Sequence, residues 1–288
     1  PSVLFDIVPR DLPEGTPRST LAIAGLKNAV KLKPAAFFSK KLASLVTPAN
    51  YEDDGALLAD CDLIIEVVVE RLDIKAKVYE WVAANRRDDA IVASNTSGLQ
   101  LSDMAASMSQ EMREHFLIMH FFNPVRYMRL LELVDGPDTK PDVLAAVADF
   151  DEKQLGKGIV YAKDTPNFIA NRIGTFGMIS VFKHMQEMDL SIEEVDTALG
   201  KAAGRPKLGV FALGDLVGLD TIDHVLGNVH DNCPDDEQSH NFVSPPFLKD
   251  MVAQGITGNK VKKGFYQRTR ERDEKGRRIT LARNWKTG

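Results

Sequence analysis

The sequence predicts an α/β protein in which an open, Rossmann-like parallel sheet is followed by a mainly α-helical domain. Three features of the 288 residues indicate this class: short apolar runs, helix-length amphipathic segments between them, and a change to a helical pattern after residue 163. Strands that are buried on both faces appear as continuous apolar runs rather than as alternating ones. The first half of the chain therefore has the pattern of repeated βα units.

The expected strands are the apolar runs at residues 3–5, 63–69, 90–93, 116–119, 130–134 and 158–162. Between them, Ile74, Val78 and Trp81 share one face of an expected helix at residues 74–85, and residues 142–150 show a similar stripe. Residues 19–46 are rich in Ala, Leu and Lys and are interrupted by Pro34, which predicts an inserted hairpin of two helices.

We expect three regions along the chain. Residues 1–162 form the sheet domain, residues 163–266 form the helical domain, and the charge-rich residues 267–288 form a surface tail or a linker. In the helical domain we expect helices at residues 169–188 and 192–203. Ser191 begins the second of these with a capping box, because Glu194 follows it three residues later.

Composition and charge narrow the range of ligands and locations. A formal net charge of -5 gives no general attraction to nucleic acid or to anionic lipid. No apolar run approaches the roughly 20 residues of a membrane-spanning helix, so we expect no membrane insertion. Cys61 and Cys233 lack the spacing of a metal or redox site. We therefore expect a cytoplasmic protein without a metal, acting on a small molecule.

Polar residues follow several of the expected strands: Asp6, Glu70, Ser94 to Ser97, and His120. In open parallel sheets, ligands bind at the carboxyl edge where such residues gather. His120 suits proton abstraction near neutral pH. If its strand lies beside that of Glu132, this carboxylate can orient the ring and stabilise the imidazolium. From spacing alone, a structural histidine is an equal alternative.

Asp6 ends what reads as the second strand of a Rossmann-like dinucleotide fold, where a carboxylate binds ribose hydroxyls and repels a 2'-phosphate. The alternative is an Asp that merely starts a turn. Ser97 and Asn171 are candidates for neutral hydrogen bonds to a substrate oxygen. No G-x-G-x-x-G turn occurs in the sequence. We expect the first βα unit, a strand, turn and helix upstream of Pro1, to be missing from an excerpt of a longer chain.

The motif His120-Phe121-Phe122-Asn123-Pro124 resembles the 3-hydroxyacyl-CoA dehydrogenases. Further motifs agree in order, namely Ile65-Glu66-Val67-Val68-Val69-Glu70, Ser94-Asn95-Thr96-Ser97, Lys163-Asp164-Thr165-Pro166, Asn171-Arg172, Asp215-Leu216-Val217-Gly218-Leu219-Asp220 and Gly264-Phe265-Tyr266. The resemblance spans residues 3–266. It is strongest to the bacterial multifunctional fatty-oxidation type, which carries an enoyl-CoA hydratase domain on the same polypeptide.

The resemblance implies an NAD-binding domain at residues 1–162 and a helical dehydrogenase domain at residues 163–266, which usually forms a homodimer. It implies oxidation of (S)-3-hydroxyacyl-CoA to 3-oxoacyl-CoA with hydride transfer to NAD, in fatty acid β-oxidation. His120 is then the base and Glu132 its partner. Ser97 and Asn171 surround the substrate hydroxyl. The family's cofactor contacts fall on Asp6, Glu70, Lys75, Ser97, Asn123 and Lys260.

Two segments depart from the family pattern. Residues 260–263 replace the usual Lys-Thr-Gly-x before Gly264, and residues 204–209 replace a Pro-Met-Gly-Pro segment on the acyl side. Acyl chain length therefore stays open. Two other functions also remain: a non-catalytic acyl-CoA-binding module, because the phosphate-binding turn is absent, and a related dehydrogenase of free 3-hydroxyacids, which generally uses a lysine base.

Overall fold

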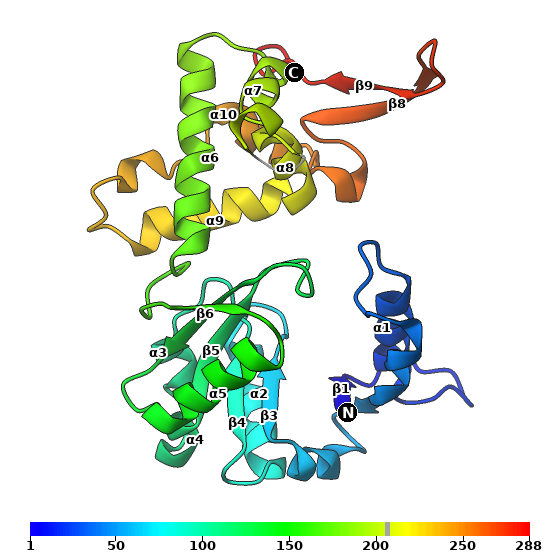
Figure 1. Cartoon of the computed structure of the whole chain (residues 1–288), viewed down its shortest axis with the longest axis vertical. Helices are drawn as coiled ribbons and strands as arrows, with labels where there is room; N and C mark the ends of the chain where they lie inside the picture. Colours follow the sequence, from blue (N-terminus) through cyan, green and yellow to red (C-terminus); the bar gives the residue numbers. More distant parts are fainter. Residues whose placement is uncertain (205–207) are drawn as a thin grey trace. The chain divides into compact units, whose positions relative to one another are not determined.

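The computed structural model describes residues 1–204 and 208–288 and divides into two compact units, Pro1–Thr165 and Pro166–Gly288 (Figure 1). The division lies close to the boundary expected after residue 162. The first unit contains two sheets with their helices, and the second is mainly helical. The predicted fold class is therefore confirmed, and each unit is described by itself below.

The larger sheet of the first unit has five strands in the order β3-β4-β5-β6-β7. These are β3 (Leu63–Glu66), β4 (Ile91–Ser94), β5 (Phe116–Phe121), β6 (Leu130–Asp135) and β7 (Gly158–Tyr161). Strands β3, β4 and β5 are parallel, whereas β6 runs antiparallel to β5 and parallel to β7. The expectation of a parallel sheet thus fails at one pair. Residues 122–129 are too short for the helical crossover that a parallel pair requires.

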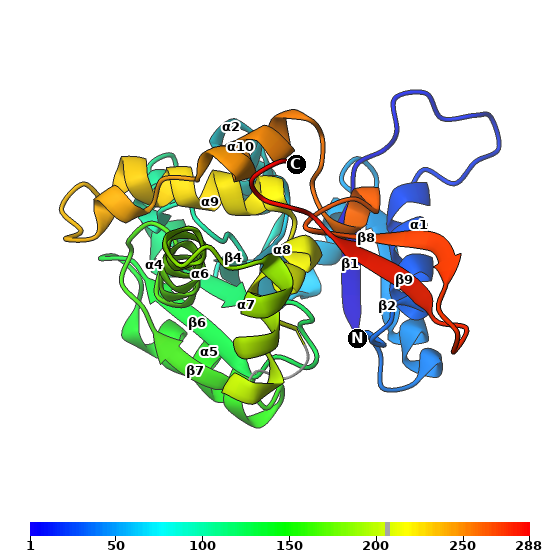
Figure 2. The same cartoon turned by 90° about the horizontal axis from the view of Figure 1, so that it is seen from above.

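Helices cover this sheet: α2 (Leu72–Asn85), α3 (Leu101–Ala105), α4 (Gln110–Glu114) and α5 (Pro141–Lys153). Helix α5 lies against β6 and β7 (Figures 1 and 2). Its buried residues Val143 and Val147 pack on Leu131 and Leu133 of β6. Pro141 begins the helix, since a proline in the first turn loses no intrahelical hydrogen bond. The expected helices at residues 74–85 and 142–150 are confirmed.

The smaller sheet pairs β1 (Ser2–Asp6) with β2 (Val46–Asn50) in parallel. Helix α1 (Thr20–Lys31) connects them and is the first helix of the expected hairpin. The prediction of a second helix is wrong, because a short 3-10 helix, Lys40–Leu45, takes its place. Strand β2 was not predicted, since Pro48 argues against a strand. Proline is nevertheless tolerated here because β2 is an edge strand that pairs only with β1 among the described residues.

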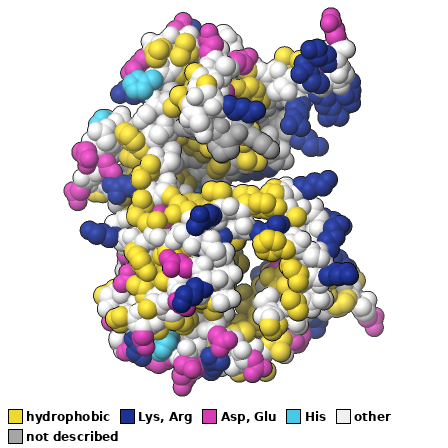
Figure 3. Space-filling model, in the orientation of Figure 1, with side chains coloured by type: hydrophobic (Ala, Val, Ile, Leu, Met, Phe, Trp, Pro, Cys, Tyr) yellow, Lys and Arg dark blue, Asp and Glu magenta, His cyan; other side chains and the backbone are white. Residues whose placement is uncertain are grey.

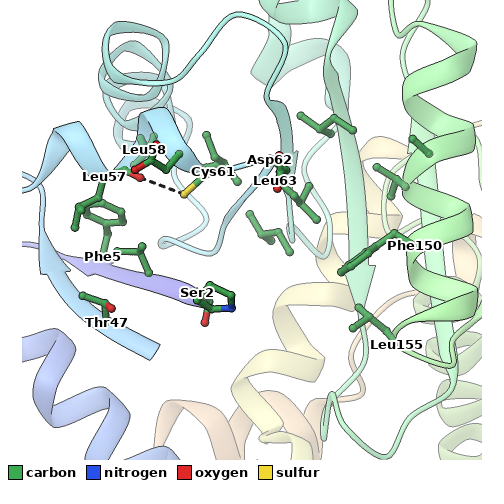
Figure 4. A pocket seen from close by; sticks show the side chains of 18 residues that line it. Ser2, Phe5, Thr47, Leu57, Leu58, Cys61, Asp62, Leu63, Phe150 and Leu155 are labelled. Carbon is green, nitrogen blue, oxygen red and sulfur yellow. Dashed lines mark hydrogen bonds between the residues drawn. The ribbon is translucent and has the colours of Figure 1, made fainter. Parts of the chain in front are cut away.

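A pocket lies between the two sheets of the first unit. Its volume is about 840 Å³, and residues of β1, β3 and α5 line it. Figure 4 shows Ser2 and Phe5 on one side and Phe150 and Leu155 on the other. A doubly wound sheet has the strand order 3-2-1-4-5-6. In that order, β2 and β1 correspond to positions 3 and 2, and β3, β4 and β5 correspond to positions 4, 5 and 6. This pocket, lined by residues of β1 and β3, lies at position 1 of that order.

Asp151 is a buried carboxylate on α5, and among the described residues neither of its oxygens accepts a hydrogen bond. Burial raises the pKa of Asp151 to about 6, against a smaller opposite effect of Lys157. Between about pH 4 and about pH 6, the folded state keeps a proton that the unfolded state has lost. The free energy of unfolding that this group contributes therefore falls as pH rises through that window and stays low above it.

We expect Asp151→Asn to raise the free energy of unfolding by about 1–3 kcal/mol at about pH 8, and by much less near pH 4. Urea unfolding at both pH values measures the difference. Asp149→Asn is the matched control, because Asp149 lies on the same helix with 59% of its side chain exposed. An equal change at both pH values would rule out an unpartnered charge as the cause.

Besides three short 3-10 helices, the second unit contains five α-helices and one hairpin among its described residues. These are α6 (Ala170–Glu187), α7 (Ile192–Ala198), α8 (Val210–Val217), α9 (Leu219–Asn232), α10 (Pro246–Ala253), β8 (Tyr266–Arg272) and β9 (Arg278–Ala282). The predicted capping box of Ser191 and Glu194 begins α7. The core is built around Phe182, Phe211 and Phe265, whose rings contact one another.

The residues expected to form a charged tail fold instead into the antiparallel pair β8 and β9. Most side chains of β8 are exposed, and Lys and Arg side chains gather over this hairpin in Figure 3. Within the described parts of the chain, no helix has the length and apolar character needed to cross a membrane. The same residues contain no cluster of His, Cys, Asp and Glu suited to a metal ion.

Candidate active site

His120 and Glu132 face each other across the antiparallel pair β5 and β6, where they are direct register partners. The distance from His120 Nδ1 to Glu132 Oε2 is 2.7 Å. Only 3% of His120 and 0% of Glu132 is exposed. An ionised carboxylate can only accept, so Nδ1–H donates and Nε2 is left as the basic nitrogen. The strand pairing on which the predicted His120–Glu132 contact depends is confirmed.

Neighbouring groups fix the position of the imidazole. The ring of Phe122 lies 4.4 Å from that of His120, centroid to centroid. The backbone N–H of Phe121 donates to Asn95 Oδ1 at 2.9 Å, which ties the end of β5 to the loop after β4. His120 itself lies inside β5 rather than after it, since the strand continues to Phe121.

Lys157 holds the connection between the two strands. Its ammonium donates to the backbone oxygens of Val125 and Met128, the latter at 2.8 Å. The cis peptide bond Asn123–Pro124 lies in the same connection, and Asn123 is exposed. The chain therefore reverses direction between His120 and Glu132 with the backbone oxygens of Val125 and Met128 satisfied.

The loop after β4 brings Ser97 beside Glu70. The Ser97 N–H donates to Glu70 Oε1 at 2.8 Å, and Thr96 Oγ1 donates to the same carboxylate at 2.9 Å. Ser97 is exposed, and 42% of the Glu70 side chain is exposed. Glu70 thus organises the loop that carries Ser97, a role that spacing did not reveal.

Lys75 is more deeply placed than the sequence suggested. Its side chain is 1% exposed, and its ammonium lies 2.8 Å from Glu66 Oε2 and 3.3 Å from Glu70 Oε2. The sequence places Glu66 in a family motif and assigns it no role of its own. The sequence feature that could have indicated Glu66 is the pair Lys75 and Tyr79, which are four residues apart and share one face of α2. Both side chains form hydrogen bonds with Glu66.

Asp6 ends β1 and is partly exposed. Its Oδ1 accepts a hydrogen bond of 2.8 Å from the N–H of Ile7, so Asp6 also caps its own turn. Both sequence alternatives, a turn-former and a carboxylate presented at the end of the strand, therefore describe it.

Asn171 and Lys260 belong to the second unit. Asn171 lies in the first turn of α6, where its backbone oxygen accepts from Thr175. Lys260 forms an ion pair with Asp220, with Nζ 2.6 Å from Oδ1. Of the variant segment at residues 204–209, residues 205–207 lie outside the described residues.

The motifs around Asp215 and Gly264 meet in the second unit. Asp215 accepts hydrogen bonds from the N–H groups of Phe265 and Tyr266, at 2.7 and 2.8 Å. A Cβ added to Gly264 would lie 2.0 Å from Asp215 Oδ1, so only glycine allows this approach. These two motifs stabilise the fold around Lys260.

Residues 3–165 match the family described as 3-hydroxyacyl-CoA dehydrogenase, NAD binding domain, and residues 168–268 match 3-hydroxyacyl-CoA dehydrogenase, C-terminal domain. A probable 3-hydroxyacyl-CoA dehydrogenase of Bacillus subtilis is 44% identical over 93% of this chain, and the chain spans 35% of its length. A probable 3-hydroxyacyl-CoA dehydrogenase of Deinococcus radiodurans is 40% identical over 96% of the chain and 78% of its own length.

Among solved structures, (S)-3-hydroxybutyryl-CoA dehydrogenase from Ralstonia eutropha is similar with a TM-score of 0.70 and 29% identity. The similarity covers 86% of this chain and 84% of that one. Both domain matches and their order thus lead to the same assignment. The chain belongs to the 3-hydroxyacyl-CoA dehydrogenase family.

Proposed function

We propose that the chain oxidises (S)-3-hydroxyacyl-CoA to 3-oxoacyl-CoA with NAD, in fatty acid β-oxidation. The observation that carries this proposal is the buried pair of His120 and Glu132 at 2.7 Å in a chain of this family. A carbon–hydrogen bond is broken as hydride while the hydroxyl loses its proton, so the reaction needs a positioned base. His120 Nε2 is such a base.

His120 accepts the hydroxyl proton on Nε2, and the ring then carries a positive charge. Glu132 lies on the opposite side of the ring and stabilises that charge as it forms, because the pair is buried and little water screens it. Ser97 and Asn171 hold the substrate oxygen by neutral hydrogen bonds in this proposal. NAD, when bound, supplies the acceptor for the hydride.

The residues present fit one part of NAD. Asp6 offers a partly exposed carboxylate at the end of β1, which suits the ribose hydroxyls. Glu70, Lys75, Ser97, Asn123 and Lys260 are proposed as further contacts; of these, Lys75 is the buried one, with 1% of its side chain exposed. The glycine turn that binds the pyrophosphate is not among the 288 residues.

The proposed role of Asp6 predicts a change in cofactor preference. We expect Asp6→Asn to improve the affinity for NADPH relative to NADH by about tenfold, since the variant removes a charge that repels the 2'-phosphate. Titration of cofactor fluorescence measures both affinities. Asp11→Asn, at an exposed position shortly after the strand, is the control. An unchanged ratio in Asp6→Asn would remove Asp6 from the ribose site.

A binding experiment separates this enzyme from a non-catalytic acyl-CoA-binding module. We expect NADH and an acyl-CoA to bind together in a chain that carries a strand, a glycine-rich turn and a helix ahead of Pro1. The chain of 288 residues is expected to bind NADH more weakly, because it lacks that turn. Retained acyl-CoA binding with no NADH binding in either chain would favour the module.

We also propose a homodimer formed through the helical unit, a covalently linked enoyl-CoA hydratase domain, and a cytoplasmic location. The 35% coverage of the Bacillus subtilis relative supports a longer polypeptide. The net charge of -5 and the two unpaired cysteines support an aqueous, reducing compartment.

A further inference from the structure

Glu66 is a buried carboxylate at the end of β3 whose oxygens are fully engaged. Oε1 accepts from the N–H of Val68 at 2.6 Å, and Oε2 accepts from Tyr79 at 2.8 Å and from Ser94 at 2.7 Å. Burial and the charge of Glu66 raise the pKa of the Tyr79 hydroxyl, so Tyr79 acts as a donor. Helix α2 and strands β3 and β4 therefore converge on one negative charge.

The Lys75 ammonium lies between two carboxylates of unequal proximity. It donates to both oxygens of Glu66, at 2.9 and 2.8 Å, and it lies 3.3 Å from Glu70 Oε2. Lys75 and Glu66 each have 1% of their side chain exposed, whereas Glu70 has 42%. A buried ammonium is costly unless it is paired. Glu66 supplies most of the negative charge that pairs with the ammonium, and Glu70 supplies little of it.

Glu70 holds the loop that carries Ser97. Its Oε1 accepts from the Ser97 N–H at 2.8 Å, and both oxygens accept from Thr96 Oγ1, at 2.9 and 3.0 Å. In the same loop Asn95 is hydrogen-bonded to the backbone beside His120. A displacement of Glu70 toward Lys75 would therefore act on the loop that joins Ser97 to the histidine strand.

We propose that Glu66 is a positioning residue: it occupies the Lys75 ammonium and thereby leaves the Glu70 carboxylate to the Ser97 loop. Without the charge of Glu66, the buried ammonium has one remaining carboxylate within 4 Å among the described residues, that of Glu70. Lys75 then draws Glu70 inward, and the N–H of Ser97 loses its acceptor. A merely structural ion pair would have no such selective effect at Ser97.

Amide hydrogen exchange and amide NMR shifts of Ser97 test the proposal without any assay of turnover. In Glu66→Gln we expect the Ser97 amide to exchange about tenfold faster or more, since it loses a hydrogen bond to a charged group. In Glu66→Gln/Lys75→Met, the ammonium is gone and Glu70 is released, so the Ser97 amide should recover the wild-type rate and shift. Glu114→Gln, which breaks a partly exposed pair with Lys140, is the control and should leave Ser97 unchanged.

Recovery of Ser97 in the double variant supports the proposal, whereas equal loss in both variants overturns it and leaves Glu66 a structural residue. Unchanged exchange in Glu66→Gln also overturns it. If Glu66→Gln does not fold, the double variant still decides, because Ser97 must be protected there.

A second experiment measures kcat, and its interpretation rests on the proposed function. If the chain oxidises 3-hydroxyacyl-CoA, kcat should fall in Glu66→Gln. Turnover that is absent even in the wild type, together with the expected Ser97 exchange, would count against the proposed function and leave the role of Glu66 intact.

Discussion

His120→Gln is expected to lower kcat for oxidation of 3-hydroxyacyl-CoA by about 10²- to 10⁴-fold, the usual contribution of a positioned general base. The Gln amide can still donate to Glu132, which preserves the contact across β5 and β6 but offers no basic nitrogen to the substrate. Binding of the acyl-CoA should change much less than kcat. Steady-state kinetics and calorimetric titration with acyl-CoA measure the two quantities.

His184→Gln is the matched control for that variant. His184 also pairs through Nδ1 with a glutamate, Glu187, at 2.8 Å, but 67% of its side chain is exposed. It should retain wild-type turnover. Full turnover in His120→Gln would instead favour a dehydrogenase of free acids with a lysine base.

Glu132→Gln is the second large effect. We expect kcat to fall by about 10²-fold or more while the affinity for acyl-CoA changes by only a few fold, because the carboxylate is needed as the proton reaches the ring. The buried position makes the loss large, since water cannot replace the missing charge. Single-turnover kinetics and the dissociation constant of acyl-CoA separate the two effects.

The control for this variant is Glu187→Gln, which removes the carboxylate of the exposed pair. An equal loss of substrate affinity and kcat in Glu132→Gln would assign Glu132 to the fold rather than to the proton transfer. Unfolding curves of both variants establish that each remains folded.

Much of the fold could be predicted, because apolar runs and helical spacing report burial directly. The antiparallel direction of β6 could not, because Leu130 to Val134 is apolar apart from Glu132, like a buried parallel strand, and only the short connection from Phe121 sets its direction. Strand β2 was not predicted because Pro48 is unfavourable in most strands. The position of β2 at the edge of a sheet, where proline is tolerated, depends on the tertiary structure.

The candidate site was partly predictable for a similar reason. His120 and Glu132 follow from strand positions, since two neighbouring strands bring such residues together. Glu66 depends on contacts from α2 and β4 that no local pattern encodes, although Lys75 and Tyr79 stand at helical spacing. Glu70 was expected at the cofactor, and its bond to the Ser97 N–H emerges only from the folded loop.

Reduction of NAD by (S)-3-hydroxybutyryl-CoA, compared with free 3-hydroxybutyrate, tests the central claim most directly. The proposed site of His120, Glu132, Ser97 and Asn171 should support formation of NADH with the thioester and much slower formation with the free acid. Turnover of the free acid alone, or no NADH formation while both NAD and the thioester are bound, would contradict the assignment of His120 as the base of a 3-hydroxyacyl-CoA dehydrogenase.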